Sequence, residues 1–185
     1  MARYLALLRG INVGGKNLIR MTELAACLGE NGLSSVTTYI ASGNVLFEAR
    51  DSSAAALTLR LEKVLAETFS YRASVVLLDR RQLRRIVARA PEGFGRRPAL
   101  ERYDVLFLKP PLTSRAALPI VPAREGVDRV SAGPGVLYFS RLVRRAAESR
   151  LARVVSMPIY QSMTIRNWNT TTKLLKLMDG GGSAK

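Results

Sequence analysis

Strand-like and helix-like hydrophobic segments alternate along residues 1–79, and their order constrains the fold more strongly than any other feature of the chain. Four short runs rich in apolar, β-branched or aromatic residues are typical of strands, at residues 3–12, 36–41, 44–48 and 73–78. Helical spacing of apolar side chains occurs at residues 22–30 and again after Asp51 and Ser52, either of which is suited to cap the second helix. The resulting order, β-α-β-β-α-β, predicts a ferredoxin-like unit.

The rest of the chain partly repeats this pattern. Asp79-Arg-Arg-Gln82 has the form of a capping box and predicts a helix that ends near Ala90. Further strands are expected at residues 103–108, 127–131 and 135–141, and short helices at residues 113–118 and 149–155. We expect a last helix from Arg166 to Met178, with Trp168, Thr172, Leu175 and Met178 near one face.

We therefore predict an α+β protein built from two ferredoxin-like, split β-α-β halves with mixed or antiparallel sheets. Residues 1–79 form the half with a glycine-rich loop, residues 80–178 form a second half with the C-terminal helix, and residues 179–185 form a flexible tail. The connectivity of the second half stays open.

The composition excludes several kinds of functional site. The 185 residues include no histidine and a single cysteine, Cys27, which excludes Ser-His and Cys-His catalytic triads, CxxC redox pairs and histidine or cysteine zinc sites. One cysteine suits a reducing compartment, and no apolar run approaches the roughly 18 residues of a membrane span. We expect a cytoplasmic protein with no metal and no cofactor.

The most distinctive segment is a glycine-rich loop after the first strand, Arg9-Gly-Ile-Asn-Val-Gly-Gly-Lys-Asn17. Gly10, Gly15 and Lys16 have the spacing of a nucleotide-phosphate loop, but Asn17 replaces the Ser or Thr that binds magnesium. No helix begins at that point to direct its amides at a phosphate, so the pattern disfavours a nucleotide hydrolase. The loop is more consistent with binding of an anion.

Two further polar segments lie at predicted element ends: Ser42-Gly43-Asn44, and Thr164 to Thr170. Our leading hypothesis is that all three segments form one pocket for a small phosphate- or carboxylate-bearing ligand. Its candidate ligand-binding residues are Arg9, Asn12, Lys16, Asn17, Ser42, Asn44, Arg166, Asn167 and Thr170. Turns and helix caps use the same residue types, so each segment also has a purely structural interpretation. No residue is assigned a catalytic role, and activity as an enzyme and oligomeric state stay open.

The charge suggests a different partner. Lys and Arg number 29 against 14 Asp and Glu, a net charge of +15, and the densest cluster is Arg80, Arg81, Arg84, Arg85 and Arg89. On a helix, Arg81, Arg85 and Arg89 are spaced i, i+4 and i+8 and share a face with Arg84, and this face could contact a nucleic-acid backbone or an acidic protein. A solvated helix face has the same pattern. A nucleic-acid-binding module is therefore the alternative function.

Several motifs together resemble a bacterial family known as domain of unknown function 1697. They are Leu-Leu-Arg-Gly-Ile-Asn-Val-Gly-Gly-Lys-Asn at 7–17, Thr38-Tyr-Ile-Ala-Ser-Gly-Asn-Val45, Ser149-Arg-Leu151, and Thr164-Ile-Arg-Asn-Trp-Asn-Thr170 followed by Lys173-Leu-Leu. The resemblance spans residues 1–178 and implies a two-part α+β fold with ferredoxin-like halves. It implies no reaction, substrate or catalytic residue.

Overall fold

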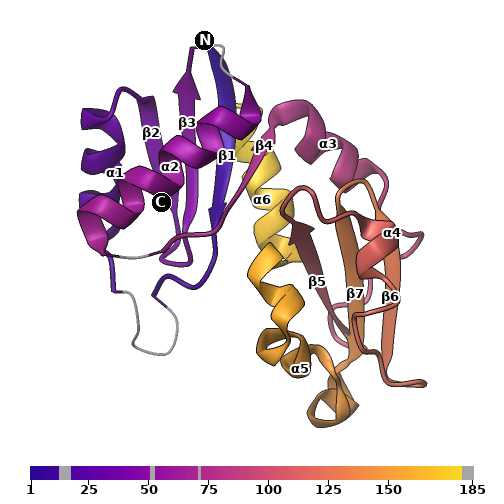
Figure 1. The fold of residues 1–185 in the computed structure, drawn as a ribbon. Coiled ribbons are helices and arrows are strands. Elements are labelled where there is room, and N and C mark those ends of the chain that lie inside the picture. Colours follow the sequence, from indigo (N-terminus) through magenta and orange to yellow (C-terminus); the bar gives the residue numbers. More distant parts are fainter. Residues whose placement is uncertain (13–17, 51–52, 71, 181–185) are drawn as a thin grey trace. The chain divides into compact units, whose positions relative to one another are not determined.

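The computed structural model of the chain describes residues 1–12, 18–50, 53–70 and 72–180. Its contacts divide the chain into two compact units (Figure 1). Unit 1 comprises Met1–Leu83 and Leu174–Lys185, and unit 2 comprises Arg84–Lys173. The chain therefore enters unit 2 within one helix and leaves it within another.

Unit 1 is a four-stranded antiparallel sheet with two helices. Its strands are β1 (Ala2–Leu8), β2 (Ser34–Tyr39), β3 (Asn44–Ala49) and β4 (Val75–Asp79), in the spatial order β2-β3-β1-β4. All three strand pairs are antiparallel. The helices are α1 (Met21–Glu30) and α2 (Ala54–Phe69). This is the predicted β-α-β-β-α-β unit.

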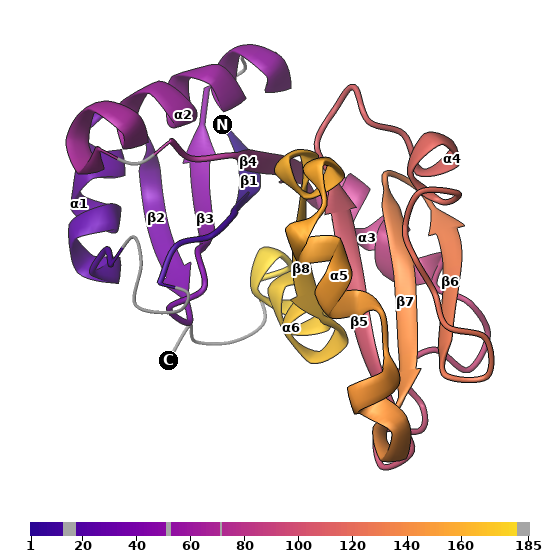
Figure 2. The same ribbon diagram turned by 60° about the horizontal axis from the view of Figure 1, so that its bottom comes forward.

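The core of unit 1 explains why these segments adopt their structure. One cluster joins β1 and β3 side chains to Leu24 and Leu28 of α1 and to the buried α2 stripe Leu57, Leu61 and Leu65, so both helices cover one face of the sheet (Figure 2). The N-cap of α2 is Ser53, whose hydroxyl accepts a hydrogen bond from the Ala56 N–H at 3.1 Å. The predicted caps, Asp51 and Ser52, lie outside the described residues.

Unit 2 repeats the topology of unit 1. Its strands are β5 (Glu101–Leu108), β6 (Asp128–Gly133), β7 (Val136–Leu142) and β8 (Met163–Asn167), all paired antiparallel in the order β6-β7-β5-β8. Numbered within each unit, both sheets have the order 2-3-1-4. The apolar side chains of α4 (Ser114–Ala117) and α5 (Leu151–Ser156) pack on one face. The predicted fold class, α+β with two ferredoxin-like halves, is confirmed, and both sheets are antiparallel.

The prediction for the last helix is wrong at its start and in its buried face. Residues 163–167 form β8, which pairs with β5, and α6 (Trp168–Met178) follows directly. The alternation of Thr164 and Arg166, both buried, fits one face of a strand. The buried side chains of α6 are Thr170, Thr171, Leu174, Leu177 and Met178. Of the predicted face, only Met178 is among them, and Thr171 and Leu174 are buried in place of the predicted Thr172 and Leu175.

The capping box at the start of α3 (Arg80–Ala88) is confirmed. The Asp79 N–H donates to Gln82 Oε1 at 2.8 Å, and the Gln82 N–H donates to Asp79 Oδ1 at 2.6 Å. Each side chain therefore satisfies a backbone donor of the other residue. None of the helices in the described part of the chain is long and apolar enough to cross a membrane.

We expect Asp79→Ala to lower the free energy of unfolding by about 1 kcal/mol, because the Gln82 amide loses its acceptor at the helix start. Urea denaturation measures this loss. Asp79→Asn keeps an oxygen acceptor and serves as the control, with most of the stability retained. Equal losses in both variants would contradict a capping role.

Candidate functional site

The first two polar segments meet in unit 1. The Leu8 N–H donates to the Gly43 carbonyl at 2.8 Å, and Asn12 Nδ2 donates to the Ala41 carbonyl at 2.9 Å. Asn12 also holds Ile19 from both sides, since its Nδ2 donates to the Ile19 carbonyl at 2.9 Å and its Oδ1 accepts from the Ile19 N–H at 2.8 Å. Asn12 therefore joins the start of the glycine-rich loop to the β2–β3 turn and to the segment that precedes α1.

The β2–β3 turn is held by Asn44, which is fully buried. Its Nδ2 donates to the Tyr39 carbonyl at 2.9 Å and to Ser42 Oγ at 3.1 Å. Gly43 has a φ of +78°, and a Cβ there would lie 2.9 Å from side-chain atoms of Ile11 and Leu8. These contacts account for the Ser-Gly-Asn sequence through packing and backbone hydrogen bonding.

The remaining residues of the glycine-rich loop are only partly described. Arg9 is half-buried, and its backbone N–H donates to the Ser74 carbonyl at 3.0 Å. Lys16 and Asn17, two of the predicted ligand-binding residues, lie outside the described residues.

The third polar segment lies in unit 2, and its side chains make local hydrogen bonds. Arg166 is buried, and its Nη1 donates to Thr164 Oγ1 and to the Ile165 carbonyl, both at 2.8 Å. Asn167 Oδ1 accepts from the Thr170 N–H at 2.7 Å and so caps α6. The union of all three segments in one pocket stays a prediction.

If Asn12 has this structural role, Asn12→Ala should lower the free energy of unfolding by about 2 kcal/mol with no ligand present, because three hydrogen bonds are lost. The φ of +52° at Asn12 adds to the cost for alanine. Asn12→Gly loses the same three hydrogen bonds, but glycine adopts a positive φ without strain. Its free energy of unfolding should therefore fall less than that of Asn12→Ala. Thermal and urea unfolding of both variants measure the difference, and an unchanged stability in Asn12→Ala would overturn the assignment.

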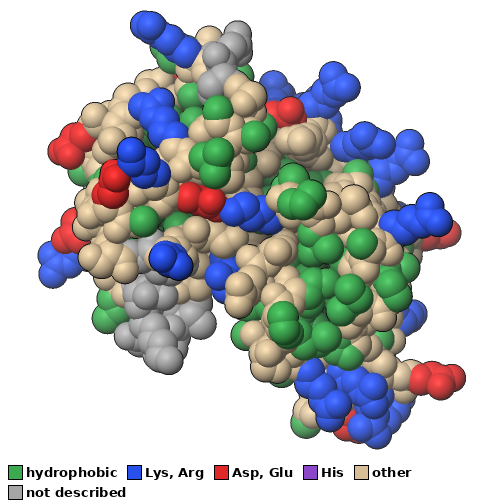
Figure 3. Space-filling view, viewed as in Figure 1, with side chains coloured by type: hydrophobic (Ala, Val, Ile, Leu, Met, Phe, Trp, Pro, Cys, Tyr) green, Lys and Arg blue, Asp and Glu red, His purple; other side chains and the backbone are tan. Residues whose placement is uncertain are grey.

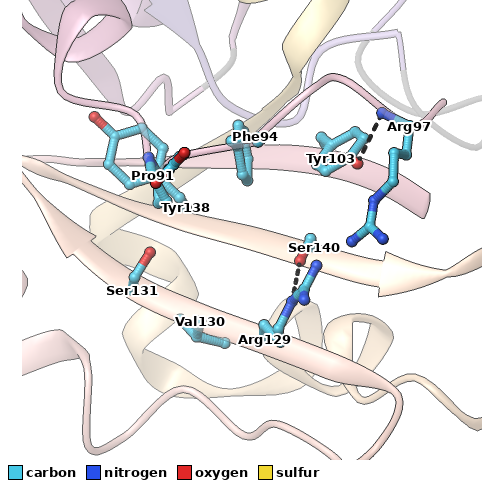
Figure 4. A pocket seen from close by; sticks show the side chains of 11 residues that line it. Pro91, Phe94, Arg97, Tyr103, Arg129, Val130, Ser131, Tyr138 and Ser140 are labelled. Atoms are coloured by element: carbon cyan, nitrogen blue, oxygen red, sulfur yellow. Dashed lines mark hydrogen bonds between the residues drawn. The ribbon is translucent and has the colours of Figure 1, made fainter.

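A pocket that the sequence did not indicate lies within unit 2, with a volume of about 570 Å³ (Figure 4). The segment 91–97, which follows α3, forms one side, and strands β5, β6 and β7 form the other. In Figure 4, Arg97 and Arg129 lie toward one end of the pocket and Ser131 lies toward the other. The residues that line it are Pro91, Glu92, Gly93, Phe94, Arg97, Tyr103, Arg129, Val130, Ser131, Tyr138 and Ser140.

The charged end of this pocket is organised by one buried carboxylate, Glu101, at the start of β5. Its Oε1 accepts from Arg129 Nη2 at 2.6 Å and from Arg97 Nη2 at 3.0 Å. The Glu101 side chain is only 6% exposed, whereas those of Arg97 and Arg129 are 56% and 67% exposed. Arg129 Nε also lies 3.4 Å from Ser140 Oγ. One buried anion therefore positions two arginines that remain open to solvent.

Aromatic side chains form the inner wall of the pocket. The ring of Phe94 meets Tyr103, Tyr138 and Trp168 edge to face, with centroid distances of 4.9, 5.4 and 5.1 Å. Tyr138 donates its hydroxyl to the Ile86 carbonyl at 2.6 Å, and burial raises its pKa to about 12. Burial also raises the pKa of Tyr103, whose hydroxyl accepts from the Arg97 N–H at 3.2 Å. Both phenols therefore stay protonated near neutral pH.

A sequence pattern could have indicated part of this site. Glu101 is the first residue of a strand whose second half is entirely apolar, and Arg97 lies four residues before it. Arg129 lies 28 residues beyond Glu101, and only the pairing of β5 and β6 with β7 brings the two side chains together. Within the described residues, no group of three or more Asp, Glu, Cys or His side chains could hold a metal ion.

A second buried carboxylate of unit 2, Asp104, lies further along β5. Its Oδ2 is 3.5 Å from Arg141 Nη2, without a hydrogen bond. Burial raises the pKa of Asp104 above its ordinary value of 3.8, and Arg141 opposes part of this shift. It lines a smaller pocket of about 340 Å³ with Trp168 and Asn169.

This raised pKa predicts the sign of a pH effect on stability. As the pH rises above 3.8, the unfolded chain ionises at Asp104 before the folded protein does, so the carboxyl lowers the free energy of unfolding until the pH passes the folded pKa. We therefore expect the stability of Asp104→Asn relative to the natural protein to increase over that range and to be flat below it. Urea denaturation between about pH 3 and pH 7 measures it. An opposite slope would show that the Arg141 pair outweighs burial.

The comparisons with known proteins support the fold without assigning an activity. A family described as protein of unknown function (DUF1697) matches residues 1–138. A solved structure, the conserved bacterial protein SP0830 from Streptococcus pneumoniae, is 29% identical, with a TM-score of 0.84 over 96% of this chain and 98% of that one. No curated protein in the comparison matches the chain.

Proposed function

The chain belongs to the family of proteins of unknown function DUF1697, and we propose that it binds a small ligand carrying a carboxylate or phosphate group in the unit 2 pocket. The observation that supports this most is the sharing of one carboxylate, Glu101, by Arg97 and Arg129. Two positive charges at one end of the pocket face one buried negative charge there. The two exposed guanidinium groups outnumber the buried Glu101 carboxylate at this end, and Glu92 is a second carboxylate in the pocket lining.

The hydrogen-bonding capacity of this pair favours an anionic ligand. Each guanidinium has five N–H donors in a planar fork, and the hydrogen bonds to Glu101 use the Nη2 atom of each arginine. The donors that face solvent match carboxylate and phosphate oxygens in geometry as well as in charge. Because Glu101 fixes Arg97 and Arg129, a ligand binds without ordering two long side chains first.

The shape of the pocket also suits a small molecule. Its volume of about 570 Å³ lies within the range of roughly 300 to 1,000 Å³ that is usual for ligand sites. The hydroxyl groups of Ser131 and Ser140 add two neutral donors and acceptors to the lining, and Phe94 adds apolar surface. The ligand class therefore agrees with the leading prediction from the sequence, whereas the proposed residues are different.

This proposal predicts a saturable increase in melting temperature with at least one member of a panel of small carboxylates and phosphates at low salt. Arg129→Gln should weaken binding of that ligand by roughly 10-fold to 100-fold, because one charge-assisted contact is lost. Isothermal titration calorimetry of the two proteins measures the ratio. Arg97→Gln should weaken binding similarly.

Matched variants separate this pocket from other sites. Arg115→Gln removes one exposed positive charge of unit 2 outside the pocket and should leave binding within about 2-fold. Equal weakening in Arg115→Gln and Arg129→Gln would contradict the proposal. A loss confined to Lys16→Ala or Arg166→Ala would instead support the pocket predicted from the three polar segments.

A further inference from the structure

The exposed face of α3 carries a line of arginines that the proposed ligand pocket does not use. Arg81, Arg85 and Arg89 are exposed, whereas Leu83 and Ile86 on the opposite face are 0% and 1% exposed. The backbone N–H of Arg89 donates to the Arg85 carbonyl at 3.0 Å, so the helical turn continues to Arg89. Figure 3 shows basic side chains projecting from the surface over α3, at the upper right of the view.

These three side chains have no acidic partner within the described residues. Arg80, at the start of the same helix, pairs with Asp179. Several other arginines of the chain pair with carboxylates, as Arg124 and Arg145 do with Glu148. The segment from Arg80 to Pro91 contains no Asp or Glu at all. The charge of the line is therefore available to an external anion.

The spacing of the line favours a regular polyanion. Side chains at i, i+4 and i+8 lie on one helix face about 6 Å apart along its axis, so the line from Arg81 to Arg89 extends about 12 Å. Phosphates of one nucleic-acid strand repeat about every 3.4 Å along the duplex axis, so the line spans three or four of them. Arginine binds such phosphates with two parallel hydrogen bonds.

We infer that the α3 arginine line, defined as Arg81, Arg85 and Arg89, is a docking surface for the phosphate backbone of a nucleic acid. Each nucleotide of a backbone carries the same phosphate charge, so this contact does not depend on the base sequence. A membrane surface is a poorer match, because the large apolar residues Leu83 and Ile86 of α3 are buried and Val87 is half-buried, which leaves little apolar surface to enter lipid. An acidic protein would have to supply carboxylates at matching spacing.

The experiment measures fluorescence anisotropy of labelled duplex DNA and single-stranded RNA of about 20 nucleotides, titrated with the protein at several salt concentrations. Three phosphate contacts predict a slope of log affinity against log salt of roughly −2.7 for duplex DNA, or about a 40-fold loss of affinity between roughly 50 and 200 mM salt. The triple variant R81Q/R85Q/R89Q should lose most of the binding and most of this slope.

The control variant R96Q/R115Q/R153Q removes the same net charge from three exposed arginines outside α3. It should retain most of the affinity and the slope, and circular dichroism should show that both variants are folded. The triple variant R81K/R85K/R89K keeps the charge and should lie between the natural protein and the glutamine variant.

Three results would overturn the inference. The first is that neither nucleic acid binds at about 50 mM salt, where phosphate contacts are strong. The second is that the α3 variant and the control variant weaken binding equally. The third is that the protein binds polyglutamate or anionic vesicles in preference to nucleic acid. The small-ligand titration of R81Q/R85Q/R89Q is expected to be unchanged, so this inference and the proposed function can fail separately.

Discussion

Each unit depends on a central strand that is buried on both faces. Residues Leu5–Leu8 of β1 and Val105–Leu108 of β5 are consecutive and all buried, although neighbouring side chains of a strand point to opposite faces. Such a strand needs a neighbour on each side and cover over both faces of its sheet. The order 2-3-1-4 gives it both neighbours. These apolar runs exclude polar side chains from the second half of each central strand, so the polar groups of the two units lie at the other end of the strand, on neighbouring strands and on the connecting segments.

The two units use their strand ends differently. In unit 1, the side-chain amides of Asn12 and Asn44 donate hydrogen bonds to backbone carbonyls, and this leaves few donors for a ligand. In unit 2, the end of the central strand carries Glu101, and two arginines converge on it from segment 91–97 and from β6. One topology therefore gives a polar structural junction in the first unit and an accessible charged pocket in the second.

Local chemistry was predictable from the sequence, whereas long-range pairing was not. The capping box of Asp79 and Gln82, the helix stripe Leu57–Leu65 and the repeated element order all follow from spacings of a few residues. The β8 strand was missed because Thr164-Ile-Arg-Asn167 is short and is followed at once by a helix, so the helical period of α6 seemed to extend backward. The Glu101 cluster depends on the register of three strands, which no local pattern specifies.

The excess of positive charge connects the proposed pocket with the α3 arginine line. With 29 basic and 14 acidic residues, at least 29 − 14 = 15 cations cannot have a carboxylate each. The carboxylates Glu101 and Glu148 each serve two arginines, and the other 25 basic residues still outnumber the other 12 acidic residues by 13. Unpaired like charges repel one another and destabilise the folded state, and an external anion relieves that repulsion where the cations are ordered. A fixed pair such as Arg97 and Arg129 suits a single small anion, whereas an open line along a helix suits a polymeric one.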